Sequence, residues 1–365
     1  MDTHIIRSYG KEYSIIDLLS DILSKNNTHL VLFCPQEHIP VTEPDTQLFS
    51  KTELFAQLTA ARNHMDAHQV HLTIVVGRSK YPEHPTATFS DFCMIYWNEI
   101  FDVIAHEVMY LSDWWLKDGA RRHYVNRHTK FTFPLPGGQL DHICTMRSQR
   151  AHAHRCVMMD HLAKYNLLHD GFSWRMLSNQ TGDAYPFRYW KEELLDPGEY
   201  PLDSDLAPEY WDTFNTQHPG EMNSLVEVVA ESTVNTVFWT EKTAKWLLYG
   251  KPFIIIGAPE INVRLRDLGF ELYDELFSYR FDTEFDLDVR AGRIAQQLHG
   301  LHLDFPTPES RQPLWNQVQP KLQRNHDRLI ELMTTDYPDP ITSWLEHEHL
   351  ALQHLVNGFI KPNSR

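Results

Sequence analysis

Residues 225–270 read LVEVVAESTVNTVFWTEKTAKWLLYGKPFIIIGAPEINVRLRDLGF, and this stretch decides the expected fold. Its two short apolar runs, residues 225–230 and 253–256, are rich in branched side chains, as buried parallel strands are. Between them the pattern predicts one helix, with Thr240 as its N-cap and Gly250 as its stop signal. A strand, loop, helix and strand in this order indicate a parallel α/β sheet.

The loop after the first strand and the start of the helix are unusually polar. Both would lie at the carboxyl edge of the sheet, where open α/β folds bind their ligands. A helix N-terminus attracts anions through its free N–H groups and its dipole. A lysine in the first turn works against that dipole, so a bound phosphate explains it better than helix stability does; a solvated helix end is the alternative. The polar set is Glu231, Ser232, Asn235, Thr240, Glu241 and Lys242.

Composition places the chain among soluble globular proteins. Its 365 residues are enough for two domains, and a hydrophobic share of 42% excludes disorder. The net charge of −16 argues against general adhesion to nucleic acid but leaves room for a local basic patch. Four scattered cysteines without paired spacing indicate reduced thiols. We expect a cytoplasmic protein, because no signal peptide or membrane-spanning run of about 20 apolar residues is present.

Alternating apolar runs predict the order of elements along the chain. In a first α/β domain, residues 1–125, we expect strands at 29–34, 70–76 and 92–97 and helices at 13–23, around 54–61 and at 101–116. In a second domain, residues 126–335, we expect strands at 142–147 and 171–177 and helices at 151–168, 286–301 and 320–333. Pro320 suits the first turn of the last of these. Residues 336–365 should form an amphipathic helix that packs across both domains.

Basic residues gather in two places. Residues 117–130 carry five cations against Asp118, which indicates either a solvated face or a hinge strip that binds a polyanion or nucleotide. The five are Lys117, Arg121, Arg122, Arg127 and Lys130. A second cluster, Arg147, Arg150 and Arg155, surrounds a strand-to-helix turn, which is a suitable place for an anion.

Several common motifs are absent. No GxGxxG follows a strand, and Gly250-Lys251 lacks the upstream glycine of a P-loop. The histidines at 152, 154 and 161 fit no familiar zinc spacing. Asp203-Ser204-Asp205 and Asp286-Leu287-Asp288 are read as surface turns rather than as the DxD motif of metal-dependent sugar transferases, because neither directly follows an apolar strand. We therefore expect no metal and no bound cofactor.

The motifs that are present resemble one family. They are FWTEKT at 238–243, GKPFI at 250–254, GAP at 257–259 and LGF at 268–270. Together with His154-Arg155 in the upstream helix, they resemble the donor-site signature of the fucosyltransferase-like branch of GT-B glycosyltransferases. The similarity is closest to phage- and virus-encoded relatives and covers about residues 131–301.

This resemblance implies a GT-B fold, that is, two Rossmann-like α/β domains facing a cleft, with C-terminal helices. It implies that Arg155 and Lys242 neutralise the diphosphate of a nucleotide-sugar donor, while Glu241 meets the ribose or the sugar beside Thr240. Glu231 and Ser232 would occupy the donor loop, where the family reads more like FEN than the AES found here. With no metal site, cations and N–H dipoles must stabilise the leaving diphosphate.

Inverting transfer of a hexosyl or pentosyl group also needs a general base from the first domain. Four residues are open candidates: Glu99, His106, Glu107 and Asp113. A hydroxylated or hydroxymethylated pyrimidine in phage DNA is one expected acceptor, contacted through Arg121, Arg122, Arg127, Arg147 and Arg150. A glycan or protein hydroxyl is another, and a non-catalytic nucleotide- or glycan-binding module with a degenerate GT-B fold is the alternative to an enzyme.

Overall fold

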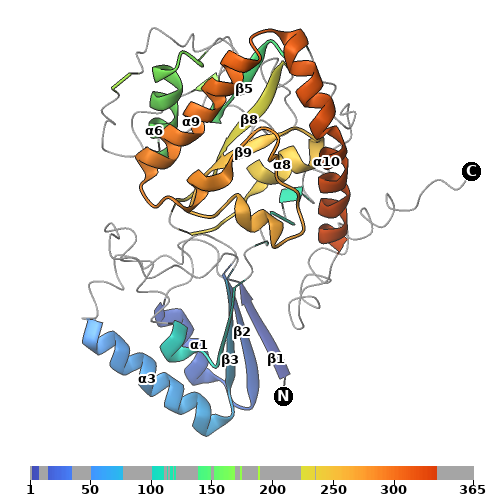
Figure 1. Ribbon diagram of the computed structural model, residues 1–365. Coiled ribbons are helices and arrows are strands. Elements are labelled where there is room, and N and C mark those ends of the chain that lie inside the picture. Colours follow the sequence, from blue (N-terminus) through green and yellow to red (C-terminus); the bar gives the residue numbers. More distant parts are fainter. Residues whose placement is uncertain are drawn as a thin grey trace, which may run out of the picture. The chain divides into compact units, whose positions relative to one another are not determined.

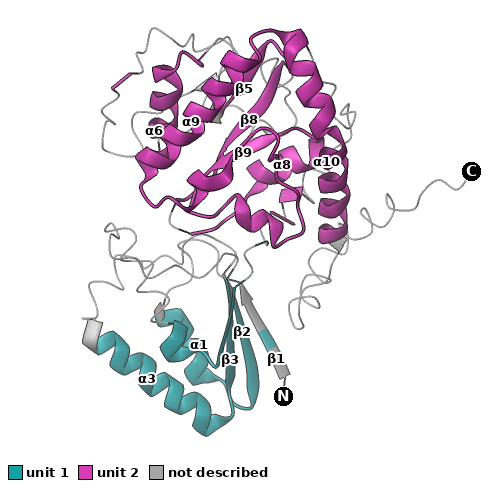
Figure 2. Cartoon of the chain, viewed as in Figure 1, with its two compact units in different colours: residues 1–115, 336–365 teal, residues 116–335 magenta. Residues whose placement is uncertain are grey.

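The chain folds as two compact units, Met1–Trp115 with Asp336–Arg365 and Leu116–Thr335 (Figure 2). The computed structural model describes residues 2–7, 15–34, 51–76, 101–110, 113, 116–117, 119–120, 139–148, 152–168, 173–174, 188–189, 223–234 and 236–334. The strand expected at 92–97 and the helix expected within 336–365 lie outside these residues. Among the described helices, none has the length and apolar character that crossing a membrane requires.

Unit 1 contains a parallel sheet with the strand order β1-β2-β3-β4. The strands are β1 (Asp2–Arg7), β2 (Thr28–Cys34), β3 (His71–Val76) and β4 (Glu107–Tyr110). Two helices, α1 (Ile15–Ser24) and α3 (Lys51–His68), pack against each other (Figure 1). Ile22, Leu30, Leu58 and Ile74 lie fully buried in the core of this unit. The predicted strands at 29–34 and 70–76 and the predicted helices at 13–23 and 54–61 are confirmed.

The helix predicted over residues 101–116 is wrong for its middle part. Residues 101–104 are helical, but Glu107–Tyr110 forms β4 and pairs with β3. Val108 and Tyr110, two residues apart, both pack on the core of unit 1, which is the period of a strand. The helical spacing of Ile104 and Val108 is thus overridden by backbone pairing with β3, a long-range contact that the local sequence pattern does not reveal.

Unit 2 contains a second parallel sheet with the order β5-β8-β9. Its strands are β5 (His142–Thr145), β8 (Ser224–Ala230) and β9 (Phe253–Ile256), and a further parallel pair joins β6 (Arg147–Ser148) to β7 (Ser173–Trp174). Four helices flank the sheet, with α6 beside α9 and α8 beside α10 (Figure 1). They are α6 (Ala153–Lys164), α8 (Glu241–Tyr249), α9 (Leu287–Asp304) and α10 (Pro308–Thr334).

The β8-α8-β9 unit forms as the sequence predicts. Every residue of β8 and of β9 is buried. Thr240 is the N-cap of α8, and its Oγ1 accepts the backbone N–H of Lys242 at 3.3 Å. Gly250 ends the helix with a φ of 68°, a left-handed conformation that glycine adopts without steric cost.

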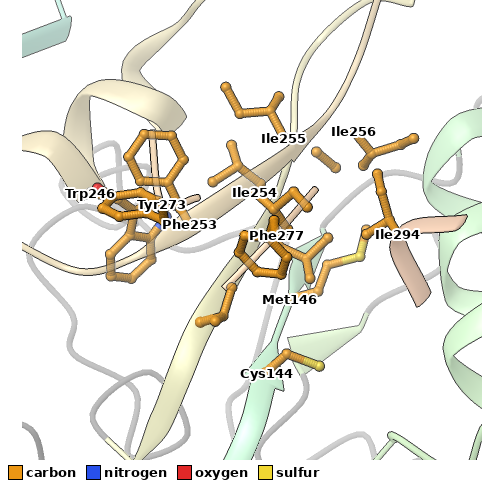
Figure 3. Close-up of a cluster of buried hydrophobic side chains, with 14 of the residues drawn as sticks. Cys144, Met146, Trp246, Phe253, Ile254, Ile255, Ile256, Tyr273, Phe277 and Ile294 are labelled. Carbon is orange, nitrogen blue, oxygen red and sulfur yellow. The ribbon is translucent and has the colours of Figure 1, made fainter. Parts of the chain in front are cut away.

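The core of unit 2 surrounds β9. Ile254, Ile255 and Ile256 are fully buried, and Ile294 of α9 lies close to the end of the strand (Figure 3). At the other end of the strand, the Phe253 and Tyr273 rings meet edge to face at 5.6 Å. This packing holds β9 between α9 and the non-helical segment that contains Tyr273, both of which follow it in the sequence.

The last described helix starts earlier than predicted. α10 begins at Pro308, so Pro320 lies inside it rather than in its first turn, and Pro313 is internal as well. An internal proline removes a backbone hydrogen bond and costs about 3 kcal/mol. The buried stripe of Trp315, Val318 and Leu322 runs on both sides of Pro320, and its burial offsets that cost.

Candidate functional site

Glu231, the first residue after β8, connects the end of that strand to the start of α8. Its carboxylate is 0% exposed and accepts three hydrogen bonds from the helix start. Oε1 accepts the backbone N–H of Thr240 at 3.0 Å and the Thr243 hydroxyl at 2.5 Å, and Oε2 accepts the Thr240 hydroxyl at 2.5 Å. Burial raises the pKa of Glu231 above its usual range. The buried carboxylate thus fixes the first turn of α8 through these three hydrogen bonds.

Lys242 lies in the first turn of α8, and its ammonium and the Glu231 carboxylate both bind the Thr240 hydroxyl. Its ammonium donates to Ser232 Oγ at 3.0 Å, Thr240 Oγ1 at 3.1 Å and Glu241 Oε1 at 3.1 Å. The side chain is 32% exposed, so the charge is held in place and remains open to solvent. One set of hydrogen bonds therefore brings together five members of the predicted polar set, namely Glu231, Ser232, Thr240, Glu241 and Lys242. The sixth, Asn235, lies outside the described residues.

His154, in the first turn of α6, joins that helix to the same edge of the sheet. Its ring is 4% exposed, and Nε2 lies 2.6 Å from the backbone carbonyl oxygen of Glu231. A carbonyl only accepts, so Nε2 carries the proton and donates it. Burial, followed by the charge of Arg155, lowers the pKa of His154 to about 3. The imidazole is therefore neutral at neutral pH.

Arg155 follows His154 and is 6% exposed. The starts of α6 and α8, which carry Arg155 and Lys242, both contact Glu231 at the end of β8. The two helix N-termini add partial positive charge at the same place. Together with the partly exposed Lys242 ammonium, they make this edge of the sheet a candidate anion site.

The basic strip of residues 117–130 begins beside this site. Leu116 and Ala120 are buried in the core of unit 2, and a Cβ added to Gly119 would lie 2.6 Å from Glu241 Cα and 3.0 Å from Glu241 N. Only a glycine permits this approach to the first turn of α8. Sequence reasoning missed the contact, although a glycine among cations was a usable signal. Arg121, Arg122, Arg127 and Arg150 lie outside the described residues, and of Arg147 only the backbone, in β6, is described.

The four base candidates fall in different places. Glu107 is the first residue of β4 and His106 directly precedes it, so both lie at the amino edge of the unit 1 sheet. Ligands of α/β sheets bind at the opposite, carboxyl edge. Asp113 comes shortly after β4 ends at Tyr110, which places it after a carboxyl end. Glu99 lies outside the described residues.

The two acidic residues of the Asp286-Leu287-Asp288 segment lie at the start of α9, which agrees with the helix predicted at 286–301. Asp286 is its N-cap, and Oδ1 accepts the backbone N–H of Val289 at 3.1 Å. Asp288 accepts from Arg188 and lies 3.0 Å from Nε2 of His161. Within the described part of the chain, no group of His, Cys, Asp or Glu has the geometry of a metal site. The Asp203-Ser204-Asp205 segment lies outside the described residues.

Comparison with known proteins adds little to this geometry. No protein-family model and no curated protein matches the chain. The solved structure of apo UGT2 from Phytolacca americana is similar at 10% sequence identity and a TM-score of 0.33, over 96% of this chain and 99% of that chain. A likeness at this TM-score carries no argument about fold or function.

Proposed function

We propose that this protein is a nucleotide-sugar-dependent glycosyltransferase that acts with inversion and without a metal ion. One observation supports the proposal: the N-termini of α6 and α8, which carry Arg155 and Lys242, both contact Glu231 at the carboxyl end of β8. Of the motifs that resemble those of a glycosyltransferase family, TEKT begins α8 at this point and GAP follows the carboxyl end of β9, whereas GKPFI ends α8 and begins β9 at the opposite edge of the sheet. The GT-B arrangement remains part of this proposal.

The two cations have a direct role in such a reaction. Breaking the bond between sugar and diphosphate leaves negative charge on the leaving nucleoside diphosphate. The Lys242 ammonium, the Arg155 guanidinium and the N–H groups of α8 would stabilise that charge in place of a metal ion. Glu241 and Ser232 already bind the Lys242 ammonium, and Glu241 would meet the ribose or the sugar. Glu231 then acts as a positioning residue, since its carboxylate is buried beneath the helix start.

The base that takes the acceptor proton would come from unit 1. Asp113 is the described candidate that we propose for this role, because it follows the carboxyl end of β4. Glu99 remains a second candidate. His106 and Glu107 are less suitable, because both lie at the amino edge of the sheet.

The acceptor is proposed from charge alone. The strip of residues 117–130 begins at the first turn of α8, beside the proposed donor site. A hydroxylated or hydroxymethylated pyrimidine in phage DNA fits this chemistry, and a glycan or protein hydroxyl is the other candidate. DNA binding should weaken as salt rises, and the double change Arg121→Ala with Arg122→Ala should reduce that salt slope by about two. A slope near zero would leave the glycan or the protein as the acceptor.

Calorimetry and hydrolysis assays with a panel of nucleotide sugars test the proposal itself. We expect one nucleotide sugar to bind and to be hydrolysed slowly, with release of the nucleoside diphosphate. Tight binding without turnover on any acceptor would favour a non-catalytic binding module. If no nucleoside diphosphate binds at all, the donor site is assigned wrongly.

A further inference from the structure

Three histidines meet at the amino edge of the unit 1 sheet, apart from the proposed donor site. The ring centroids of His29 and His71 lie 5.1 Å apart in an edge-to-face contact. Those of His71 and His106 lie 4.6 Å apart with the rings tilted. The three residues come from the starts of β2 and β3 and from the residue before β4. Protonation of two neighbouring rings would place two positive charges within about 5 Å of each other.

His106 is the member whose hydrogen bonds fix its protonation state. Its Nδ1 accepts the backbone N–H of Leu72 at 3.1 Å, so Nδ1 carries no proton. The other nitrogen, Nε2, lies 3.1 Å from Oδ1 of Asp66 and donates to that carboxylate. The backbone of His106 also donates to the carbonyl of Leu72 at 2.9 Å. His106 thus connects the start of β3 to α3. Its ring can make both side-chain hydrogen bonds only when it is neutral.

A proton added at Nδ1 would turn an acceptor into a donor facing the Leu72 N–H. Two donors cannot bond each other, so this contact would become repulsive. The contact with Asp66 would survive, since Nε2 donates in both protonation states. Acid therefore acts specifically on the side of the ring that touches β3.

The charged groups around the cluster have opposing effects. Asp66 and Arg62 of α3 face His106, and an ion pair of 3.5 Å joins them. On the sheet side, His29 lies 3.0 Å from the Thr73 hydroxyl, and the charge of Glu107 acts on it. Burial lowers the pKa of His106 and outweighs the hydrogen bond to Asp66, which acts to raise it. Burial also lowers the pKa of His29. The folded unit thus disfavours protonation of both.

We propose that unit 1 contains an acid-sensitive lock, in which neutral His106 holds the amino edge of β3 and β4 against α3 and protonation at Nδ1 releases it. The sign follows from the lowered pKa: the unfolded chain binds the proton more readily, so the stability is present above about pH 6.5 and is lost as the pH falls below it.

Hydrogen exchange followed by mass spectrometry tests the lock on the whole protein. Peptides that contain Leu72 and β4 should exchange about tenfold faster at pH 5.5 than at pH 7.5, after correction for the intrinsic pH dependence, because one pH unit below the reference value shifts a one-proton opening equilibrium tenfold. Equal corrected protection at both pH values in the wild-type protein would overturn the proposal, and this result needs no variant.

Two replacements of His106 separate its two nitrogens. In His106→Asn the amide oxygen can replace Nδ1 as the acceptor for Leu72 and does not titrate, so protection of β3 should persist at pH 5.5. In His106→Gln the amide reaches toward Asp66 instead, so β3 should exchange fast at both pH values. His4→Asn, an exposed site on β1, is the control and should follow the wild type. If His106→Asn loses protection with acid as strongly as the wild type does, His106 is not the lock.

Discussion

The ring of His154 donates a hydrogen bond to the backbone carbonyl of Glu231 at 2.6 Å, and this contact joins the start of α6 to the end of β8. Through the carboxylate of the same glutamate, the start of α8 is fixed as well. The start of α6, which carries Arg155, and the start of α8, which carries Lys242, are thereby held at one end of one strand.

Removing the ammonium of Lys242 should weaken binding of a nucleoside diphosphate. The loss of a charge-assisted hydrogen bond should raise the Kd on the order of 10- to 150-fold in calorimetry of Lys242→Ala. Lys164→Ala is the matched control, because it removes the same charge from the exposed last turn of α6, the end away from Arg155. If Lys242→Ala binds the nucleoside diphosphate with unchanged affinity, the donor-site assignment is wrong.

Acid should destabilise unit 2 through His154. Because its pKa is lowered to about 3, the unfolded chain takes up the proton first, and the stability falls as the pH drops below about 6.5. Between pH 7.5 and 5.5 the loss should be about 1.4 kcal/mol. Urea unfolding at the two pH values measures it. His154→Gln keeps a donor for the Glu231 carbonyl without titrating, so its stability should change less; the same loss in this variant would contradict the assignment.

Chelation should leave transfer unaffected. Asp286 and Asp288 are occupied in capping α9 and in pairing with Arg188 and His161, so they are not free to hold a metal ion. Excess EDTA should not change the transfer rate, and Asp286→Ala should cost about 1 kcal/mol of stability through the lost cap. Activity that disappears with EDTA and returns with Mn²⁺ would show that the reaction needs a metal.

Replacing Asp113 should slow the chemical step without affecting donor binding. Loss of a general base lowers kcat by about 10²- to 10⁴-fold, so Asp113→Asn should show this fall with an unchanged Kd for the donor. Asp102→Asn, on the exposed side of the short helix before β4, is the control. If Asp113→Asn keeps full activity, Glu99 becomes the next residue to replace.

Pro320→Ala should stabilise unit 2. The proline is exposed within α10, where its missing N–H and the clash of its ring with the carbonyl of Asn316 cost up to about 3 kcal/mol. Differential scanning calorimetry should therefore show a raised Tm. Pro308→Ala is the control, since Pro308 opens the helix, where a proline costs little. An equal shift in both variants would mean that the interior position carries no penalty.

Local patterns predicted the centre of the fold well. The β8-α8-β9 unit, the Thr240 cap and the left-handed Gly250 were all readable because caps, stop signals and apolar runs act within a few residues of one another. Two other segments were not readable from local patterns. Residues 107–110 form a strand because they pair with β3, and residues 308–320 are helical because α10 packs through a long buried stripe. Such contacts join distant parts of the chain and leave no mark in a local window.

The sequence by itself determined that Lys242 starts a helix after a buried strand, since helix caps and strand composition are local properties. Only the tertiary structure decided what surrounds it. The buried carboxylate of Glu231 binds the start of α8. The ring of His154 binds the Glu231 carbonyl, and this contact places the start of α6, which carries Arg155, at the same end of β8. The reason is physical: a hydrogen bond between buried groups depends on where folding places them, and spacing along the chain carries no record of it.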